Sequence, residues 1–133
     1  MPTTTVYFAV KAWDEKPYNE APGELKLTRC HNAYTYSGDL DAQSVCEYLM
    51  VDREDGTGHL VGHERITGRL AGRAGSFILE HHGTFDNTSV TARVVILPDT
   101  GTGVLRGLRG DGSLALGGHA EQYPLSLNYN FSD

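Results

Sequence analysis

The chain has 133 residues, 39% of them hydrophobic and 21% charged, which is typical of one globular domain spanning 1–133. Its formal net charge is −6, and no stretch is rich in Lys and Arg, so we expect no nucleic-acid partner. No apolar run approaches the roughly 18 residues of a membrane span, so we expect no membrane partner either.

The N-terminal stretch MPTTTVYFAVKAWDE has neither a basic start nor a hydrophobic segment, unlike a secretory signal. We therefore expect a cytoplasmic protein, in which Cys30 and Cys46 stay reduced. Their wide spacing does not fit a CxxC redox pair, and both are expected to pack as small apolar groups.

Turn-forming residues recur about every 10–15 residues along the chain and separate short segments with strand composition. In chain order, the predicted strands are 6–13, 25–36, 44–51, 59–67, 76–83, 90–97, 105–108, 113–120 and 123–131. The stretches 67–75 and 109–112 are predicted turns, and no segment has helical spacing with end caps. The expected fold is all-β: a single antiparallel up-and-down β-barrel of about eight strands, because closure removes exposed sheet edges.

Two polar residues fall on the faces that we expect to point into the barrel. Side chains alternate along a strand, and the more apolar face of 59–67 includes Glu64. In 76–83 the more apolar face carries Phe77, Leu79 and His81. If these strands pair, the β-carbons of Glu64 and His81 lie about 5 Å apart when opposite, or about 7–8 Å when diagonal. Such a pair could move a proton, or it could simply bridge two strands in an apolar interior.

The remaining strands are less cleanly divided into two faces. In 44–51 we place Tyr48 and Met50 inside, because Glu47 on the other face favours water. Neither face of 25–36 is clean, so Arg29 is either lumenal or a rim residue. Trp13, at the end of the first strand, either lines the barrel mouth or covers the end of the core.

Metal and cofactor motifs are absent from the sequence. His81 and His82 are adjacent in a strand and point to opposite sides, while His59 and His63 would lie roughly 13 Å apart. There is no HxH, HExxH or GxSxG pattern, and the glycine-rich stretch 101–112 lacks a GK[ST] ending. We therefore expect no metal and no cofactor.

Several stretches resemble a bacterial family of small domains of unknown function that have the allene-oxide-cyclase-like barrel fold. They are KAWDEKPY (11–18), LTR (27–29), YSGDL (36–40), EYLM (47–50), VGHERITGRLAGRAGSFILEHHGTFD (61–86), GTGVLRGLRGDG (101–112) and LSLNYNF (125–131). One departure is LPDTGTG (97–103), where Asp99 and Thr100 replace a small pair.

The resemblance implies a barrel similar to those of allene oxide cyclase, dirigent proteins and polyketide cyclases, which bind a reactive apolar molecule in the lumen. Related barrels also form dimers or trimers, so a homo-oligomer is expected. Fold-level analogy does not establish chemistry in this chain.

Two functional hypotheses follow from these observations. In the first, the lumen binds a small apolar ligand, as in a cyclase or isomerase. Its candidate catalytic residues are Glu64, His81 and Tyr48, and its candidate ligand-binding residues are Arg29, Met50, Phe77, Leu79 and Trp13. In the second, the core is filled and the chain is a non-catalytic interaction protein. An eight-stranded barrel has room for side chains or one small ligand, so the size of the lumen distinguishes the two.

Overall fold

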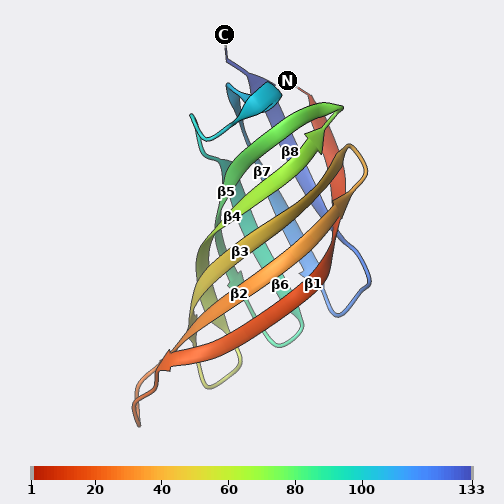
Figure 1. Cartoon of the computed structure of the whole chain (residues 1–133). Helices are drawn as coiled ribbons and strands as arrows, with labels where there is room; N and C mark the ends of the chain where they lie inside the picture. Colours follow the sequence, from red (N-terminus) through yellow and green to blue (C-terminus); the bar gives the residue numbers. More distant parts are fainter. Residues whose placement is uncertain (1, 133) are drawn as a thin grey trace.

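The computed structural model describes residues 2–132 and is almost entirely β-sheet (Figure 1). The strands are β1 (Thr3–Asn19), β2 (Lys26–Ser37), β3 (Leu40–Asp52), β4 (Gly58–Leu70), β5 (Arg73–Phe85), β6 (Ser89–Ile96), β7 (Leu108–Gly117) and β8 (Tyr123–Phe131). A short 3₁₀ helix, η1 (Gly103–Leu105), lies between β6 and β7.

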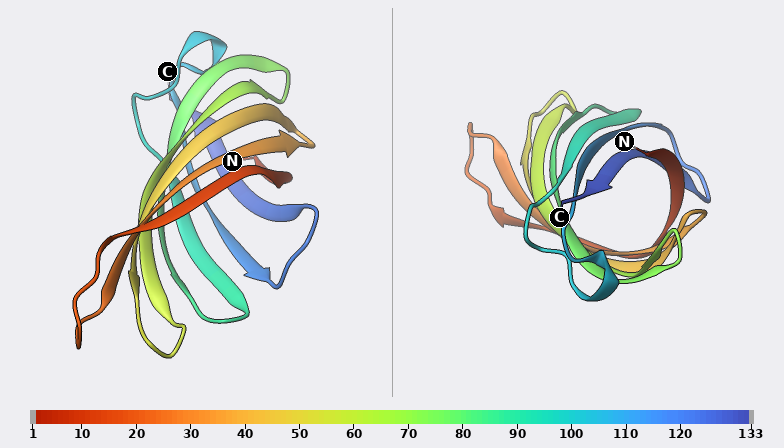
Figure 2. Two further views of the ribbon diagram at one scale, coloured as in Figure 1. Left: turned by 60° about the horizontal axis from the view of Figure 1, so that its bottom comes forward. Right: turned by 90° about the horizontal axis from the view of Figure 1, so that it is seen from above.

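Each strand pairs antiparallel with the next one along the chain, and β8 pairs with β1 to close the barrel. The closing register places Val6 opposite Leu125. Seen from above, the strands form a ring (Figure 2). Closure satisfies the backbone groups that a sheet edge would leave unpaired. The predicted all-β, up-and-down barrel of about eight strands is therefore confirmed.

Strand β3 shows most clearly how the sequence sorts its side chains. Every second residue from Leu40 to Met50 is buried, and the residues between them are exposed. This alternation places Cys46, Tyr48 and Met50 on the inner face, as predicted, and Glu47 on the outer face. The inner faces of the strands supply the hydrophobic core, which includes Phe77 and Leu79.

The first strand is longer than the barrel that it closes. Its pairing with β8 ends at Phe8, whereas its pairing with β2 continues to Asn19. The register with β2 shifts between Val10 and Ala12. Beyond that point β1 forms an extension that lies along β2 alone, while β2 itself stays paired with β3; the end of β1 is at the lower left of Figure 1. Trp13 lies on this extension.

The structure corrects two predicted boundaries near the C-terminus. The predicted strand 105–108 is wrong, because η1 occupies Gly103–Leu105 and β7 begins only at Leu108. The predicted turn 109–112 is also wrong, since it lies inside β7. Its glycines allow close contact within the sheet: a β-carbon on Gly110 would lie 2.0 Å from a backbone oxygen of β8.

The hairpin between β4 and β5 is tighter than the predicted turn 67–75. The two strands reach Leu70 and Arg73, so only Ala71 and Gly72 form the turn. Both have positive φ, at 50° and 82°, as a two-residue hairpin turn that matches the strand twist requires.

Among the residues that the structure describes, no helix has the length and apolarity that a membrane crossing requires.

Candidate functional site

A cavity of about 480 Å³ opens at the end of the barrel formed by the β3–β4, β5–β6 and β7–β8 connections. This is the lower end in Figure 1. Its aromatic lining residues are Phe8, Trp13, Tyr34, Tyr48, Phe85 and Tyr123. Its aliphatic lining residues are Val10, Met50, Leu60, Val90, Ala92, Leu114 and Leu116. The barrel interior is thus open at this end, with the volume and lining typical of small-molecule sites.

Behind the cavity lies a buried acid–imidazole pair. Glu64 is fully buried and His81 is 2% exposed. In the β4–β5 register Glu64 is opposite Leu79 and Gly62 is opposite His81, so the pair is diagonal on the inner face. His81 Nε2 lies 2.8 Å from Glu64 Oε1. The predicted contact between the two side chains is confirmed, while a role in binding or catalysis stays a prediction.

Hydrogen bonds hold Glu64 and His81 in one arrangement. Tyr36 Oη donates to the second carboxylate oxygen of Glu64 at 2.5 Å. With Nε2–H donating to Glu64, Nδ1 of His81 carries the lone pair. That nitrogen is buried and has no hydrogen-bond partner among the described residues, while His81 itself lines the cavity. Nδ1 is thus the one polar atom of the imidazole whose hydrogen-bonding capacity the fold leaves unused.

Tyr48 packs against His81 at the base of the cavity. The two rings meet edge to face, with centroids 5.3 Å apart. Gly62 makes this possible, because a β-carbon there would lie 2.5 Å from the Tyr48 ring. Burial raises the pKa of Tyr48 well above its ordinary value, so its hydroxyl stays protonated. Tyr48 is therefore a hydrogen-bond donor at neutral pH.

The inner face of β2 contributes polar residues that the sequence did not single out. Cys30 donates to Asn32 Oδ1 at 2.8 Å, and Asn32 Nδ2 donates to Tyr34 Oη at 3.0 Å. Burial raises the pKa of Tyr34 and of Tyr36, and the Glu64 carboxylate raises the pKa of Tyr36 further. The available signal was their regular two-residue spacing, which put Cys30, Asn32, Tyr34 and Tyr36 on one face.

One set of side chains has metal-ligating atoms close together. The ligating atoms of Cys46, Glu64 and His81 all lie within 4.8 Å of one another. Burial, together with the nearby Glu64 carboxylate, raises the pKa of Cys46, so the thiol stays protonated. Because a thiolate is the form that binds a metal, this set is poorly prepared for one.

The other predicted ligand-binding residues are distributed differently from expectation. Met50 lines the cavity, and Trp13 lies at its mouth with half of its surface exposed. Phe77 and Leu79 do not line the cavity; they are buried in the packed core. Of the two positions expected for Arg29, lumenal or at the rim, the lumenal one is wrong. The alternation of β2 turns its side chain outward, where it is 62% exposed and bonds Glu47 at 2.6 Å.

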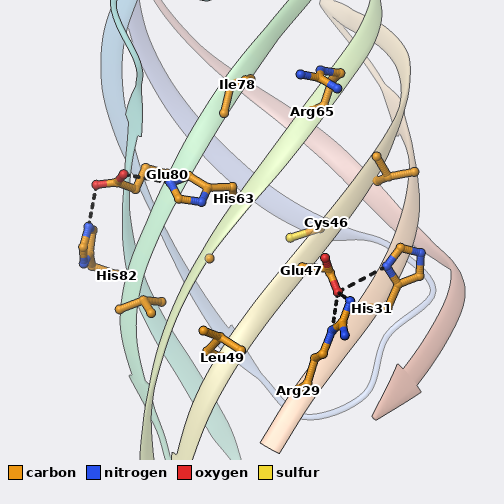
Figure 3. A pocket seen from close by; sticks show the side chains of 13 residues that line it. Arg29, His31, Cys46, Glu47, Leu49, His63, Arg65, Ile78, Glu80 and His82 are labelled. Atoms are coloured by element: carbon orange, nitrogen blue, oxygen red, sulfur yellow. Dashed lines mark hydrogen bonds and ion pairs between the residues drawn. The ribbon is translucent and has the colours of Figure 1, made fainter. Parts of the chain in front are cut away.

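The outer surface of β2 to β5 carries a second hollow, of about 660 Å³ (Figure 3). On one side Glu47 accepts from Arg29 and lies 3.8 Å from His31. On the other side Glu80 bonds two imidazoles, those of His82 at 2.8 Å and His63 at 3.0 Å. The hydrogen bonds from these histidines lower the pKa of Glu80. The same hollow is also lined by Val45, Leu49 and Val61, each about half exposed.

Comparison with known proteins places the chain in a family. Residues 4–129 match the family described as "Protein of unknown function (DUF3224)". The chain belongs to this family. A member of DUF3224 from Shewanella oneidensis MR-1, described as a protein with unknown function, has a crystal structure that superposes with a TM-score of 0.81. The two chains are 27% identical, and the match covers 100% of this chain and 99% of the other. No curated protein matches the chain.

Membership in DUF3224 confirms the family resemblance found in the sequence. It establishes the barrel and the family, and the family description assigns no activity. The likeness to allene oxide cyclase stays a prediction.

Proposed function

We propose that the protein binds a small, mostly apolar molecule in the barrel lumen. The observation that carries the proposal is the 480 Å³ cavity, whose lining includes the buried imidazole of His81. A solid core would have left no such space, and an imidazole with a purely structural role would normally have both nitrogens satisfied. Tyr48 and Met50 would contact the ligand, and Trp13 would cover it at the mouth.

The hydrogen bonds around His81 support a further role in proton exchange. Glu64 holds the Nε2 proton, as the acid of a hydrolase triad does, and so keeps the lone pair on Nδ1. In a cyclase- or isomerase-like step, Nδ1 would take a proton from the ligand, and the resulting imidazolium would return it elsewhere on the same molecule. The buried Glu64 carboxylate would stabilise that cation. The Tyr48 hydroxyl could donate to an oxygen of the ligand.

The binding proposal is tested by filling the cavity. Leu116→Trp places an indole in the lining, whereas Ala115→Trp places one on the exposed outer face of the same strand. Native mass spectrometry of each protein, purified from a cell extract, would detect a retained small molecule. We expect the wild type and Ala115→Trp to carry an additional mass that Leu116→Trp lacks. An identical mass distribution for all three proteins would contradict the proposal.

The role of the buried pair is tested by substituting Glu64 and His81, with the neighbouring His82 as the control. His81→Ala removes the lumenal imidazole, and His82→Ala removes an exposed one on the same strand. We expect His81→Ala and Glu64→Gln to weaken retention of the molecule, and His82→Ala to leave it unchanged. Full retention by both lumenal variants would show that the pair has no part in recognition.

A second candidate function, self-association through the outer face, is favoured by the exposed apolar residues between β2 and β5. Val45, Leu49 and Val61 are each about half exposed on this face. Glu47 with Arg29, and Glu80 with two histidines, lie on the same face, and a two-fold axis would place this face against its own copy. We propose a second copy of this chain as the partner.

Sedimentation velocity over a range of concentrations tests the self-association. We expect Leu49→Lys to shift the wild-type protein toward monomer, because it buries a charge in the proposed interface. Val95→Lys, at an exposed position on β6 outside the hollow, is the control. A wild type that remains monomeric at the highest concentration would exclude a homo-oligomer.

The compartment is part of the proposal as well. We infer a cytoplasmic protein, supported by two buried cysteines that are free in the structure.

A further inference from the structure

Apart from histidines, the side chains of the lumen lining that carry a charge at neutral pH are all carboxylates. Three carboxylates, Glu15, Asp52 and Asp86, belong to the lining. Neither Lys nor Arg is found among the lining residues of the part of the chain that the structure describes. Since Arg29 lies on the outer surface, an anionic ligand would find no permanent positive charge in the cavity.

The carboxylates differ in how far they are already engaged. Asp86 is committed to its own turn, where one of its oxygens accepts from the backbone and hydroxyl groups of Thr88 and Ser89. Among the described residues, Glu15 accepts only from the indole of Trp13, at 3.3 Å. Asp52 accepts from the Thr28 hydroxyl through one oxygen. Glu15 and Asp52 therefore each keep an oxygen free at the cavity mouth.

The lysine nearest in register does not neutralise this charge. Lys26 is the β2 partner of Asp52, but it does not line the cavity. Among the described residues, the ion pairs do not include one between Lys26 and Asp52. The half-buried Asp52 thus lies at the rim without a paired cation.

The aromatic side chains of the lining also favour a positively charged ligand. Six aromatic rings line the cavity, including the single Trp of the chain, Trp13, beside Glu15. A positive group within about 6 Å of an aromatic face is attracted to the ring, with Trp the strongest partner. Aromatic rings combined with carboxylates, and with neither Lys nor Arg, are the composition that recognises organic cations, whereas an anion would be repelled by the rings and the carboxylates.

We propose that the ligand of the lumen is an organic cation, an amine or ammonium group carried on an apolar body. The apolar body fills the cavity toward Met50 and Tyr48, and the cationic group lies at the mouth, beside Trp13 and Glu15 on β1. Asp52 on β3 adds negative charge to the same lining. His81, which belongs to the lining, then lies at the buried end of the molecule. This inference rests on the proposed lumenal binding and specifies the chemical class of its ligand.

A matched set of probes tests the charge preference. Phenylbutylamine, phenylbutanol and phenylbutyrate share one apolar body and end in a cation, a neutral group and an anion. Quenching or enhancement of Trp13 fluorescence reports their binding, because this indole lies at the mouth and is the single Trp of the chain. We expect the amine to bind about tenfold more tightly than the alcohol, and the acid to bind most weakly.

Carboxylate variants locate the effect at the mouth. Glu15→Gln and Asp52→Asn should each reduce the preference for the amine over the alcohol by severalfold. Asp41→Asn, at an exposed position on the same strand as Asp52, removes the same charge elsewhere and should leave the preference unchanged. Glu15 is exposed, so its variant keeps the test valid if Asp52→Asn fails to fold.

The outcomes separate the two proposals. Equal affinity for amine and alcohol, or tighter binding of the acid, would overturn the cation preference and leave lumenal binding intact. A preference that Asp41→Asn reduces as much as Asp52→Asn would reflect only the net charge and would also overturn it. Failure of all three probes to bind would count against lumenal binding itself, and the cation preference would fall with it.

Discussion

The hydrogen bond from Tyr36 to Glu64 is the contact on which the buried pair depends most directly. The carboxylate is completely enclosed, and it accepts from Tyr36 Oη at 2.5 Å and from His81 Nε2 at 2.8 Å. A hydrogen bond to a charged group contributes about 1.5–3 kcal/mol, and a buried group left without a partner costs about 1–3 kcal/mol. Tyr36→Phe should therefore lower the free energy of unfolding by about 1.5–3 kcal/mol.

Glu64→Leu removes the acceptor from both donors. It leaves the Tyr36 hydroxyl and His81 Nε2 unpaired, so we expect a loss of about 2–6 kcal/mol from two such groups. In the double variant Tyr36→Phe/Glu64→Leu, the unpaired hydroxyl no longer exists. The double loss should then be smaller than the sum of the single losses by about 1–3 kcal/mol.

Urea unfolding at neutral pH measures all four proteins of this cycle. Tyr7→Phe, which removes an exposed hydroxyl, is the control and should change the free energy of unfolding by no more than about 0.5 kcal/mol. Additive losses, with a coupling below about 0.5 kcal/mol, would show that the hydrogen bond contributes nothing to stability. The claim that Tyr36 holds the Glu64 carboxylate in place would then lose its basis.

Three further predictions concern protonation and metal binding. Burial raises the pKa of Cys30 to about 12, and it also raises the pKa of Cys46. The free energy of unfolding should therefore be constant below the ordinary thiol pKa of 9.0 and fall as the pH rises above it, because only the unfolded chain then loses the thiol protons. Urea unfolding across this range checks the sign, and Cys30→Ala should weaken the decline; an unchanged slope would contradict the burial argument. Hydrogen bonds within its own turn lower the pKa of Asp86, so the wild type should lose stability as the pH falls below 3.8, and Asp86→Asn should lose less there. Added Co²⁺ should produce no thiolate charge-transfer absorption, because the Cys46 thiol is protonated and Glu64 already accepts from two donors. An absorption band that appears with Co²⁺ and disappears in Cys46→Ser would instead show a metal site formed by Cys46, Glu64 and His81.

Much of this architecture could be predicted from local pattern alone. Period-two alternation identifies a strand and its two faces, because successive side chains point to opposite sides of a sheet. Where one face is clearly apolar, as around Glu64 in β4 and His81 in β5, the inner face follows directly. The contact between these two side chains was predictable for that reason, and the glycine-rich hairpin between them keeps the strands adjacent in space.

Turn prediction failed where glycines lie inside a strand and allow close contact with the neighbouring strand. The run Arg109–Gly112 looked like a turn because glycine is common in turns. In the barrel, Gly110 and Gly112 lie in β7, where a β-carbon would lie 2.0–2.1 Å from backbone oxygens of β8. A close approach between two paired strands leaves no local sequence signature that differs from that of a bend.

The local sequence pattern alone predicts short strands of alternating polarity, separated by turns, that form a closed sheet. It also places the carboxylate of Glu64 and the imidazole of His81 on inward faces. Only the closed barrel decides which face of β2 is inner, and it selects Asn32, Tyr34 and Tyr36 while turning Arg29 to the surface. The physical reason is that both faces of β2 mix polar and apolar groups, so burial energy within the strand does not distinguish them. Pairing with β1 and β3 sets the orientation instead, and through it the sign of the charge that lines the lumen.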